Sequence, residues 1–316
     1  MDIEAVKAQV LALPELQAWP DMLRIFIYQA NQPNQVWDWP FRACRAVGGE
    51  ESLAASSAAA ILCMMPGAAL IDDMLDQDPR GEHLRLGDAA AANLSFAFQA
   101  ATYKLISQTP VDAERRSAVL ACFAQMALTI AYGQELDKQN LSGEENYWKV
   151  THAKSSSYFG AAMYAGAIIG LANPDIAVRL RNLGELTGDV IQLHDDIRDA
   201  FETPANPDWK QMRNNLLLLY AQTADHPDRD RFLALRPRVD DPKALKEAQE
   251  ILVRCGAVSY GMYLVCQRYM ASKKILEETQ LADPAPLREV IVKYVRPLAD
   301  LLREYGIEVP AEIAVV

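Results

Sequence analysis

Two aspartate clusters with the same spacing are the residues in this sequence best suited to carry chemistry. Both read Asp-Asp-x-x-Asp, and their members are Asp72, Asp73, Asp76, Asp195, Asp196 and Asp199. On a helix, positions i and i+4 share a face, where like charges destabilise the helix unless a cation compensates them. Oxygen-only ligands suit Mg²⁺, so we predict that all six bind this metal and, if their helices face each other, clamp a diphosphate. The alternative is that each cluster is simply a solvated helix end.

The surrounding pattern predicts that these clusters lie on helices of an all-α protein. Alanine, leucine and methionine dominate long runs, and neither hairpin turns nor sustained alternation indicates a strand. The expected helices are 2–13, 20–31, 40–48, 52–76, 86–108, 111–138, 144–171, 174–201, 208–223, 241–278 and 285–304. Runs such as 54–71 are apolar on nearly every face and must be surrounded by other helices. We expect one large bundle forming a single domain over residues 1–316, with 224–243 as a polar surface excursion.

Composition and charge exclude several classes of protein. The chain has 316 residues, of which 51% are hydrophobic and 23% charged, so it is neither disordered nor a small disulfide scaffold. The net charge of −11, without a basic cluster, disfavours binding to nucleic acid. The uncharged stretch from Ala58 to Ile71 is too short to span a bilayer. Five scattered cysteines read as reduced thiols, so we expect a cytoplasmic protein without a membrane span.

Further segments accompany the two clusters and together point to a family. Residues 133–137 read Gly-Gln-Glu-Leu-Asp, residues 145–154 run from a glutamate to a lysine, and residues 208–221 end in Leu-Leu-Leu-Leu-Tyr-Ala. The second cluster lies at the end of the segment 188–199, in which a glutamine stands three positions before Asp195. With the clusters in this order, residues 40–275 resemble the trans-isoprenyl diphosphate synthases, the polyprenyl synthetase family of the isoprenoid synthase fold.

This resemblance implies a helical bundle around a central apolar cavity and a magnesium-dependent reaction on an allylic prenyl diphosphate. Asp72 and Asp76 would bind two Mg²⁺ ions, and Asp195, supported by Asp199, would bind a third. Three cations would help to hold the diphosphate, namely Arg80, Lys154 and Arg213. The C–O bond then breaks because these positive charges stabilise the departing diphosphate, with Gln192 near the reacting carbon or the diphosphate. The resemblance also suggests a homodimer, for which residues 86–108 offer an apolar interface.

The sequence departs from the family where the family binds isopentenyl diphosphate through a lysine, arginines and a histidine. The aligned positions hold Val36, Trp37, Trp39 and Met65. Each lost charge-assisted hydrogen bond is worth roughly 1.5–3 kcal/mol, so a second diphosphate cannot be held by the same means. The two tryptophans present aromatic faces that suit a carbocation or an apolar acceptor, unless they are ordinary core residues. Alternatively, Arg42 and Arg45 supply the missing charges.

Three functional hypotheses follow from this pattern. The first is a prenyltransferase whose acceptor is isopentenyl diphosphate or another molecule. The alternative is a class I terpene synthase, a carbon–oxygen lyase that converts a C15, C20 or longer prenyl diphosphate without a second substrate. A third, a non-catalytic subunit, is disfavoured because the six clustered aspartates are present. Gly67 and Ala68, just before the first cluster, are small and indicate room for a long prenyl chain.

Overall fold

The structure, a computed structural model, describes residues 3–32, 36–304, 309–311 and 313–314. Every regular element in these residues is a helix, which confirms the predicted all-α class. In chain order the elements are α1 Ile3–Leu11, α2 Pro14–Ala18, α3 Pro20–Ala30, α4 Trp39–Ala46, η1 Glu51–Ala54, α5 Ala55–Asp76, α6 His83–Leu86, α7 Asp88–Ser107, α8 Ala113–Gln139, α9 Glu144–Thr151, η2 His152–Ser156, α10 Ser157–Ile169, α11 Pro174–Phe201, α12 Pro207–Lys210, α13 Leu216–Thr223, α14 Arg229–Leu235, η3 Arg236–Arg238, α15 Pro242–Arg254, α16 Ala257–Glu278 and α17 Ala285–Glu304.

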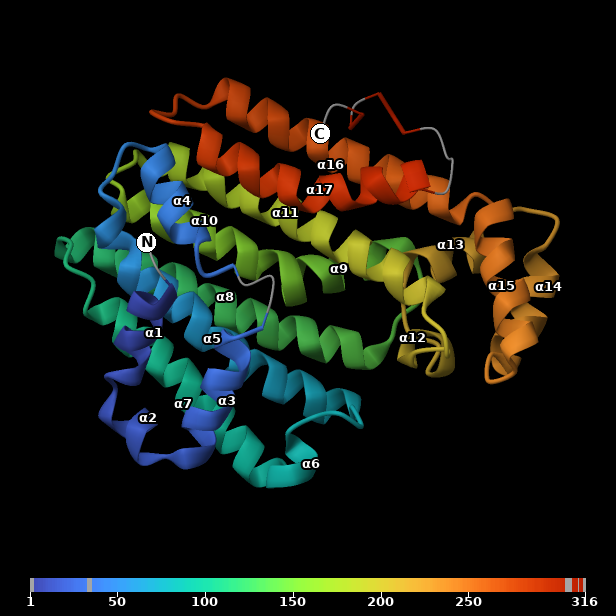
Figure 1. The fold of residues 1–316 in the computed structure, drawn as a ribbon, viewed down its shortest axis with the longest axis horizontal. Coiled ribbons are helices and arrows are strands. Elements are labelled where there is room, and N and C mark those ends of the chain that lie inside the picture. The colour runs from blue at the N-terminus through green and yellow to red at the C-terminus, as the bar shows by residue number, and fades with distance from the viewer. Residues whose placement is uncertain (1–2, 33–35, 305–308, 312, 315–316) are drawn as a thin grey trace.

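The long helices lie side by side along the length of the molecule (Figure 1). Helix α5 packs against α7, α10 packs against α11, α4 and α8, and α11 packs against α16. The short helices α14 and α15 lie at one end of this bundle (Figure 1). A core of buried apolar side chains runs through these helices. The assignment of residues 1–316 to a single domain stays a prediction.

Local residues explain where the helices that carry the aspartate clusters begin or end. Helix α11 begins with a proline, and the side chain of Asn173 caps it by accepting a hydrogen bond from the backbone N–H of Asp175. Helix α5 ends immediately after Asp76, because Gln77 adopts a left-handed conformation with φ 52°. The first cluster therefore occupies the last turn of α5, and the second lies within the last two turns of α11.

Several predicted ranges differ from the structure, and the differences are clearest in three of them. The range 208–223 is two helices, because Met212 turns left-handed with φ 57° and interrupts it. The range 241–278 is also divided, since Gly256 has φ 89° between α15 and α16. The range 144–171 is continuous but contains a π-helical turn at 152–156. The expected surface excursion at 224–243 contains α14 and η3.

Two helical segments are long and apolar enough to cross a membrane by length and composition. They are Glu51–Asp76 and Ala113–Gln139, with mean hydropathies of 1.8 and 1.2 over their most apolar windows. The window in the first is 72% buried inside the protein, which is typical of a core helix, whereas that in the second is 39% buried. One side of α8 is therefore apolar and uncovered.

Candidate active site

A cavity of about 150 Å³ brings charged side chains from five elements together. We call it the acidic cavity, and its charged or amide-bearing lining residues are Asp137, Lys154, Gln192, Asp196, Asp199, Asp208, Arg213 and Asn214. These residues come from α8, η2, α11, α12 and the segment that precedes α13. Lys154, Gln192, Asp199 and Arg213 were predicted site residues, and the structure places all four on this one wall.

The first cluster adjoins the acidic cavity and has a third carboxylate beside it. Oxygen atoms of Asp72, Asp76 and Asp137 lie within 4.8 Å of one another. Gly133 permits this arrangement, because a Cβ atom there would lie 2.6 Å from the backbone nitrogen of Lys154. Three hard oxygen ligands at this spacing fit a divalent cation such as Mg²⁺. Asp72 Oδ1 is buried, and it is paired with the ammonium of Lys154.

Two cations hold these carboxylates in the structure. The Nζ atom of Lys154 lies 2.7 Å from Asp72 Oδ1 and 2.7 Å from Asp137 Oδ2. Arg213 Nη1 lies 2.5 Å from Asp76 Oδ2. Burial raises the pKa of Asp76, and the hydrogen bond from Arg213 opposes this shift. Burial alone would lower the pKa of Lys154, but the neighbouring carboxylates raise it overall, so its ammonium stays charged.

The second cluster divides its side chains among different environments. Asp199 lines the acidic cavity, whereas Asp195 lines a neighbouring cavity. Arg198 Nη2 joins the two, at 3.3 Å from Asp195 and 3.2 Å from Asp199. Asp199 and the two cations that hold the first cluster line one cavity. The joint role of the two clusters stays a prediction.

Asp196 corrects one prediction, because both of its carboxylate oxygens are already engaged. It is 3% exposed. Its Oδ2 accepts a hydrogen bond of 2.7 Å from the backbone N–H of Leu216, and its Oδ1 accepts one of 2.9 Å from Gln192 Nε2. Burial raises the pKa of Asp196 to about 7. This placement is at odds with a metal-ligand role and fits a residue that orients Gln192 and the start of α13.

Two other predicted residues lie away from the acidic cavity. Arg80 has an 81% exposed side chain, and its guanidinium pairs with Asp78 at 3.0 Å. Asp73 is half-buried beside Asp78, and burial is the main cause of its raised pKa. Asp73 lies outside the group of three carboxylates at Asp72. The predicted roles of Arg80 in diphosphate binding and of Asp73 in metal binding therefore have no support from this geometry.

The second cavity, of about 410 Å³, contains two of the positions where the sequence departs from the family pattern. Val36 and Met65 lie on its wall together with Asp195, and the other lining residues are Gln29, Gln32, Phe159, Ile191, His194, Arg198, Lys293, Tyr294 and Pro297. The lining thus combines apolar and aromatic side chains with amides, cations and one carboxylate. Val36 and Met65, which are distant in the sequence, face one space beside a predicted metal ligand.

The two predicted substrate-binding tryptophans do not line this second cavity. Trp39 is 1% exposed and packs behind the wall, with its ring centre 5.2 Å from that of Phe159 and 6.0 Å from that of Tyr294. Trp37 packs on Phe41 and lines a separate cavity. We correct the prediction accordingly: Phe159 and Tyr294 supply the aromatic faces, and Trp39 supports them.

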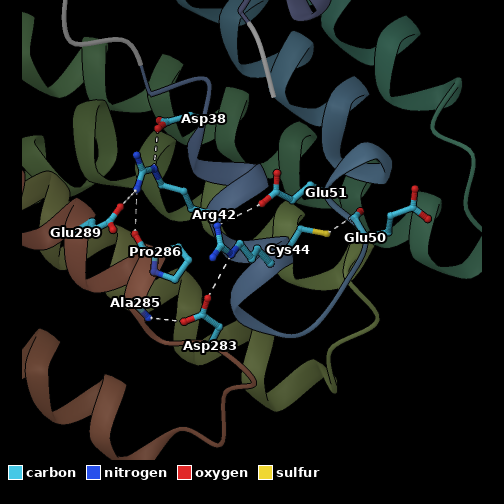
Figure 2. A network of polar contacts seen from close by, with 10 residues as sticks. Asp38, Arg42, Cys44, Glu50, Glu51, Asp283, Ala285, Pro286 and Glu289 are labelled. Atoms are coloured by element: carbon cyan, nitrogen blue, oxygen red, sulfur yellow. Dashed lines mark hydrogen bonds and ion pairs between the residues drawn. The ribbon is translucent and has the colours of Figure 1, made fainter.

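Arg42 and Arg45 are bound elsewhere and do not replace the missing charges. Figure 2 shows Arg42 between Asp38 and Glu289, with nitrogen–oxygen distances of 2.6 and 2.9 Å. Arg45 pairs with Asp283 at 3.2 Å (Figure 2). Both arginines line the separate cavity of Trp37, not the second cavity. They connect α4 to the start of α17.

A third space, the apolar cavity, lies between α5, α7 and α8. It has a volume of about 300 Å³ and includes Gly67 and Ala68 in its wall. The other lining residues are Met64, Ile71, Ala92, Ser95, Phe96, Gln99, Ala127, Ile130, Ala131 and Gln134. Gly67 also allows α7 to approach, because a Cβ atom there would lie 3.1 Å from Phe98 Cβ. The predicted small residues therefore lie where an alkyl chain fits.

Sequence reasoning missed Asp137 as a member of the site. The segment 133–137 matched the family pattern, but its aspartate received no role. The available signal was the i, i+4 spacing from Gly133 to Asp137, which places the carboxylate one turn along the same face of α8.

Comparisons with known proteins find relatives among the isoprenyl diphosphate synthases. A short chain isoprenyl diphosphate synthase of Methanothermobacter thermautotrophicus is 28% identical over 266 residues, which cover 79% of this chain and 81% of that protein. The octaprenyl diphosphate synthase of Escherichia coli is 24% identical over 272 residues, covering 79% of this chain and 80% of that protein.

Solved structures share the fold. The geranylgeranyl pyrophosphate synthetase of Pyrococcus horikoshii matches with a TM-score of 0.80 at 19% identity, covering 92% of this chain and 93% of that one. A polyprenyl synthase of Caulobacter crescentus, complexed with calcium and isoprenyl diphosphate, matches with a TM-score of 0.75 at 20% identity, covering 92% and 96%. The family model for polyprenyl synthetases matches residues 41–252, and this chain therefore belongs to the polyprenyl synthetase family.

Proposed function

We propose that this protein ionises an allylic prenyl diphosphate in a Mg²⁺-dependent reaction and transfers the prenyl group to an acceptor other than isopentenyl diphosphate. The observation that carries the proposal is the contrast between two neighbouring cavities. Carboxylates and two cations surround the acidic cavity. The second cavity has Val36 and Met65 where the family has anion-binding residues.

The metal would be held by carboxylates from three helices. We assign Asp72, Asp76 and Asp137 to one side of the site, and Asp195 with Asp199 to the other, in keeping with three ions. The pairing of Asp72 and Asp137 with the ammonium of Lys154 supports a site for positive charge. A relative crystallised with calcium and isoprenyl diphosphate supports a divalent ion at such a site. When bound, Mg²⁺ supplies positive charge that stabilises the departing diphosphate.

The chain's own residues bind and orient the substrate around that site. Lys154 and Arg213 lie at the carboxylates and can donate to diphosphate oxygens from the same positions. The amide of Gln192 is fixed at both ends, since its Oε1 accepts from Ser155 Oγ at 3.3 Å and its Nε2 donates to Asp196. The prenyl chain would lie in the apolar cavity beside Gly67 and Ala68, which excludes water from the carbocation.

A class I terpene synthase is the second candidate. The apolar and aromatic part of the lining of the second cavity favours it, because Phe159, Ile191 and Tyr294 line a space in which a carbocation and a folded chain fit. In that reaction the substrate's own double bond captures the cation. The two candidates share the ionisation step and differ only in whether a second substrate is consumed.

Product analysis distinguishes these functions. The protein is incubated with Mg²⁺ and C10, C15 or C20 allylic diphosphates, with and without isopentenyl diphosphate and candidate apolar acceptors. Our proposal expects diphosphate release and a prenylated product other than a longer diphosphate. Hydrocarbon or alcohol from the allylic substrate alone supports the terpene synthase. Longer diphosphates that form only with isopentenyl diphosphate contradict our choice of acceptor, and absence of diphosphate release contradicts both candidates.

We also propose that the protein is a cytoplasmic homodimer that associates through α7 and α8. Phe96, Leu128 and Tyr132 are 70%, 67% and 61% exposed. They lie on adjacent helices, and Phe96 forms part of the mouth of the apolar cavity. Exposed large apolar groups gathered in this way are typical of an interface. Sedimentation should therefore show a dimer that Phe96→Glu with Leu128→Glu dissociates, whereas Leu233→Glu on α14 leaves it intact. A monomeric wild-type protein would contradict the interface.

A further inference from the structure

The loop that carries Arg213 has a conformation that its own residues do not favour. Met212 lies in the left-handed region with φ 57°, where side chains with a Cβ atom are strained. The turn is closed by a hydrogen bond of 3.1 Å from the backbone N–H of Arg213 to the carbonyl oxygen of Asp208. Such a conformation persists only where the surrounding structure holds it.

Two asparagine side chains hold the outer side of this loop. Asn140 Nδ2 donates to the carbonyl oxygen of Met212 at 3.1 Å. Asn214 Nδ2 donates in the opposite direction, to the carbonyl oxygen of Leu141 at 2.7 Å. The end of α8 and the Arg213 loop are therefore bound to each other by reciprocal amide hydrogen bonds.

A buried arginine holds the inner side of the loop. Arg236, on η3, is 3% exposed, although the surrounding sequence suggested a surface excursion. Its Nη2 donates to the carbonyl oxygens of Asp208 and Arg213, both at 3.2 Å. One guanidinium nitrogen thus joins both ends of the turn that places Arg213 at Asp76.

Burying the charged guanidinium of Arg236 costs free energy, which indicates that this side chain has a specific role. Its Nε atom is buried and has no hydrogen-bond partner. Burial lowers the pKa of Arg236 to about 10, while the nearby Asp208 opposes this shift. The side chain therefore remains charged at neutral pH.

We propose that Arg236 is a positioning residue for diphosphate binding, which fixes the backbone of the Arg213 loop and so the direction of the Arg213 guanidinium. Arg236 itself touches no substrate. The inference rests on the proposed function in one respect, namely that Arg213 holds the diphosphate.

The binding of inorganic diphosphate in the presence of Mg²⁺ tests this role without catalysis. Arg236→Lys keeps the charge, but its side chain is one atom shorter and lacks the guanidinium. We expect its dissociation constant, measured by titration calorimetry, to rise about tenfold, which corresponds to the loss of one or two hydrogen bonds. The matched control is Arg238→Lys, an exposed arginine in the same turn, which should bind as the wild type does.

A double-mutant cycle separates positioning from a general effect. If Arg236 acts through Arg213, then Arg236→Lys should weaken binding in the wild-type background and have no further effect in the Arg213→Met background. An equal effect in both backgrounds, or no effect in either, overturns the proposal. Failure of both Arg236→Lys and Arg236→Gln to fold also overturns it, because the residue would then serve the fold as a whole.

Amide hydrogen exchange provides a test that does not depend on substrate. Arg236→Lys should increase exchange in residues 211–215, and Arg238→Lys should not. Unchanged exchange in Arg236→Lys contradicts the positioning role. Increased exchange together with a wild-type protein that does not bind diphosphate contradicts the proposed function and leaves the structural link between Arg236 and the loop intact.

Discussion

Residues of α11 line both the acidic cavity and the second cavity, but the other side chains that line the two cavities differ. In the first, Lys154 and Arg213 each pair with carboxylates at 2.7 Å or less. In the second, Val36 and Met65 form part of an apolar wall, and Arg198 is already paired with Asp195 and Asp199. This contrast supports our proposal that the first cavity, and not the second, holds a diphosphate and its metal ions.

Under the proposed function, ionisation and capture of the prenyl group depend on separable parts of the bundle. The groups needed to stabilise a leaving diphosphate converge from α5, α8, η2 and α11. The lysine, arginines and histidine of the family pattern are absent at Val36, Trp37, Trp39 and Met65, and Arg42 and Arg45 pair with acids beside α17. The second cavity has other cations, namely Arg198, which is paired with Asp195 and Asp199, and Lys293, which lies over the ring of Tyr294. Each absent charge-assisted bond represents roughly 1.5–3 kcal/mol of lost binding.

The largest expected effect concerns the acidic side of this comparison. Asp72→Asn removes one negative charge from the group of three carboxylates. We expect Mg²⁺-dependent release of diphosphate from an allylic substrate to fall at least about 10³-fold, since metal-based charge stabilisation contributes several kcal/mol. Asp88→Asn, at the exposed start of α7, is the matched control and should leave the rate unchanged. A rate close to wild type in Asp72→Asn would show that the acidic cavity is not where ionisation occurs.

A second test changes the apolar side to resemble the family pattern. Val36→Lys combined with Met65→His introduces two hydrogen-bond donors into the wall beside Asp195. We expect the dissociation constant for isopentenyl diphosphate to fall at least about tenfold. Val36→Leu with Met65→Leu controls for altered packing. If the wild-type protein already binds isopentenyl diphosphate as tightly as the modified one, the contrast between the two cavities has no functional meaning.

A third test concerns the space for the prenyl chain. Ala68→Phe places a ring in the apolar cavity beneath the first cluster. We expect the rate with a C20 substrate to fall about tenfold relative to that with a C10 substrate, because overpacking by a large side chain costs 1–3 kcal/mol. The C10 rate serves as the internal control. An equal change for both lengths would place the chain elsewhere.

The smallest expected effect concerns an ion pair of His152, which lies on the same π-helical turn as Lys154. His152 Nε2 lies 3.2 Å from the buried carboxylate of Asp189, which raises the pKa of His152 above its ordinary value of 6.5. Ser156 and Arg268 donate to the same carboxylate, and Glu185 acts on His152 from α11.

Because the folded-state pKa is the higher one, this contact stabilises the protein fully below pH 6.5, and the stabilisation is lost as pH rises through the folded-state value. His152→Gln should therefore lower the melting temperature by about 2 °C at most below that pH and by less above it. A difference that grows with pH would contradict the assignment.

Long helices were predictable because the residues that begin and end them are local sequence signals. The expected ranges 174–201 and 285–304 coincide with α11 and α17. Ranges 208–223 and 241–278 were wrong because a left-handed residue, Met212 or Gly256, lies between two helices that we predicted as one. Hydrophobic periodicity does not reveal a left-handed residue. A methionine in that conformation gives even less sequence signal than a glycine.

The site was predictable where residue type and spacing were sufficient, and not where tertiary packing decides. The spacing of the aspartates identified both clusters, but it did not show that Asp196 turns inward to the start of α13. The polar run around Arg236 indicated exposure, whereas packing against the Arg213 loop buries it. Trp39 lies behind Phe159 for the same reason.

The most direct test of the contrast between the cavities is equilibrium binding of two diphosphates in the presence of Mg²⁺. One ligand is an allylic thiolodiphosphate that does not ionise, and the other is isopentenyl diphosphate, which is added to the protein already saturated with the analogue. We predict that the allylic analogue binds and that isopentenyl diphosphate does not bind to the resulting complex. Binding of isopentenyl diphosphate to that complex with comparable affinity would contradict our account.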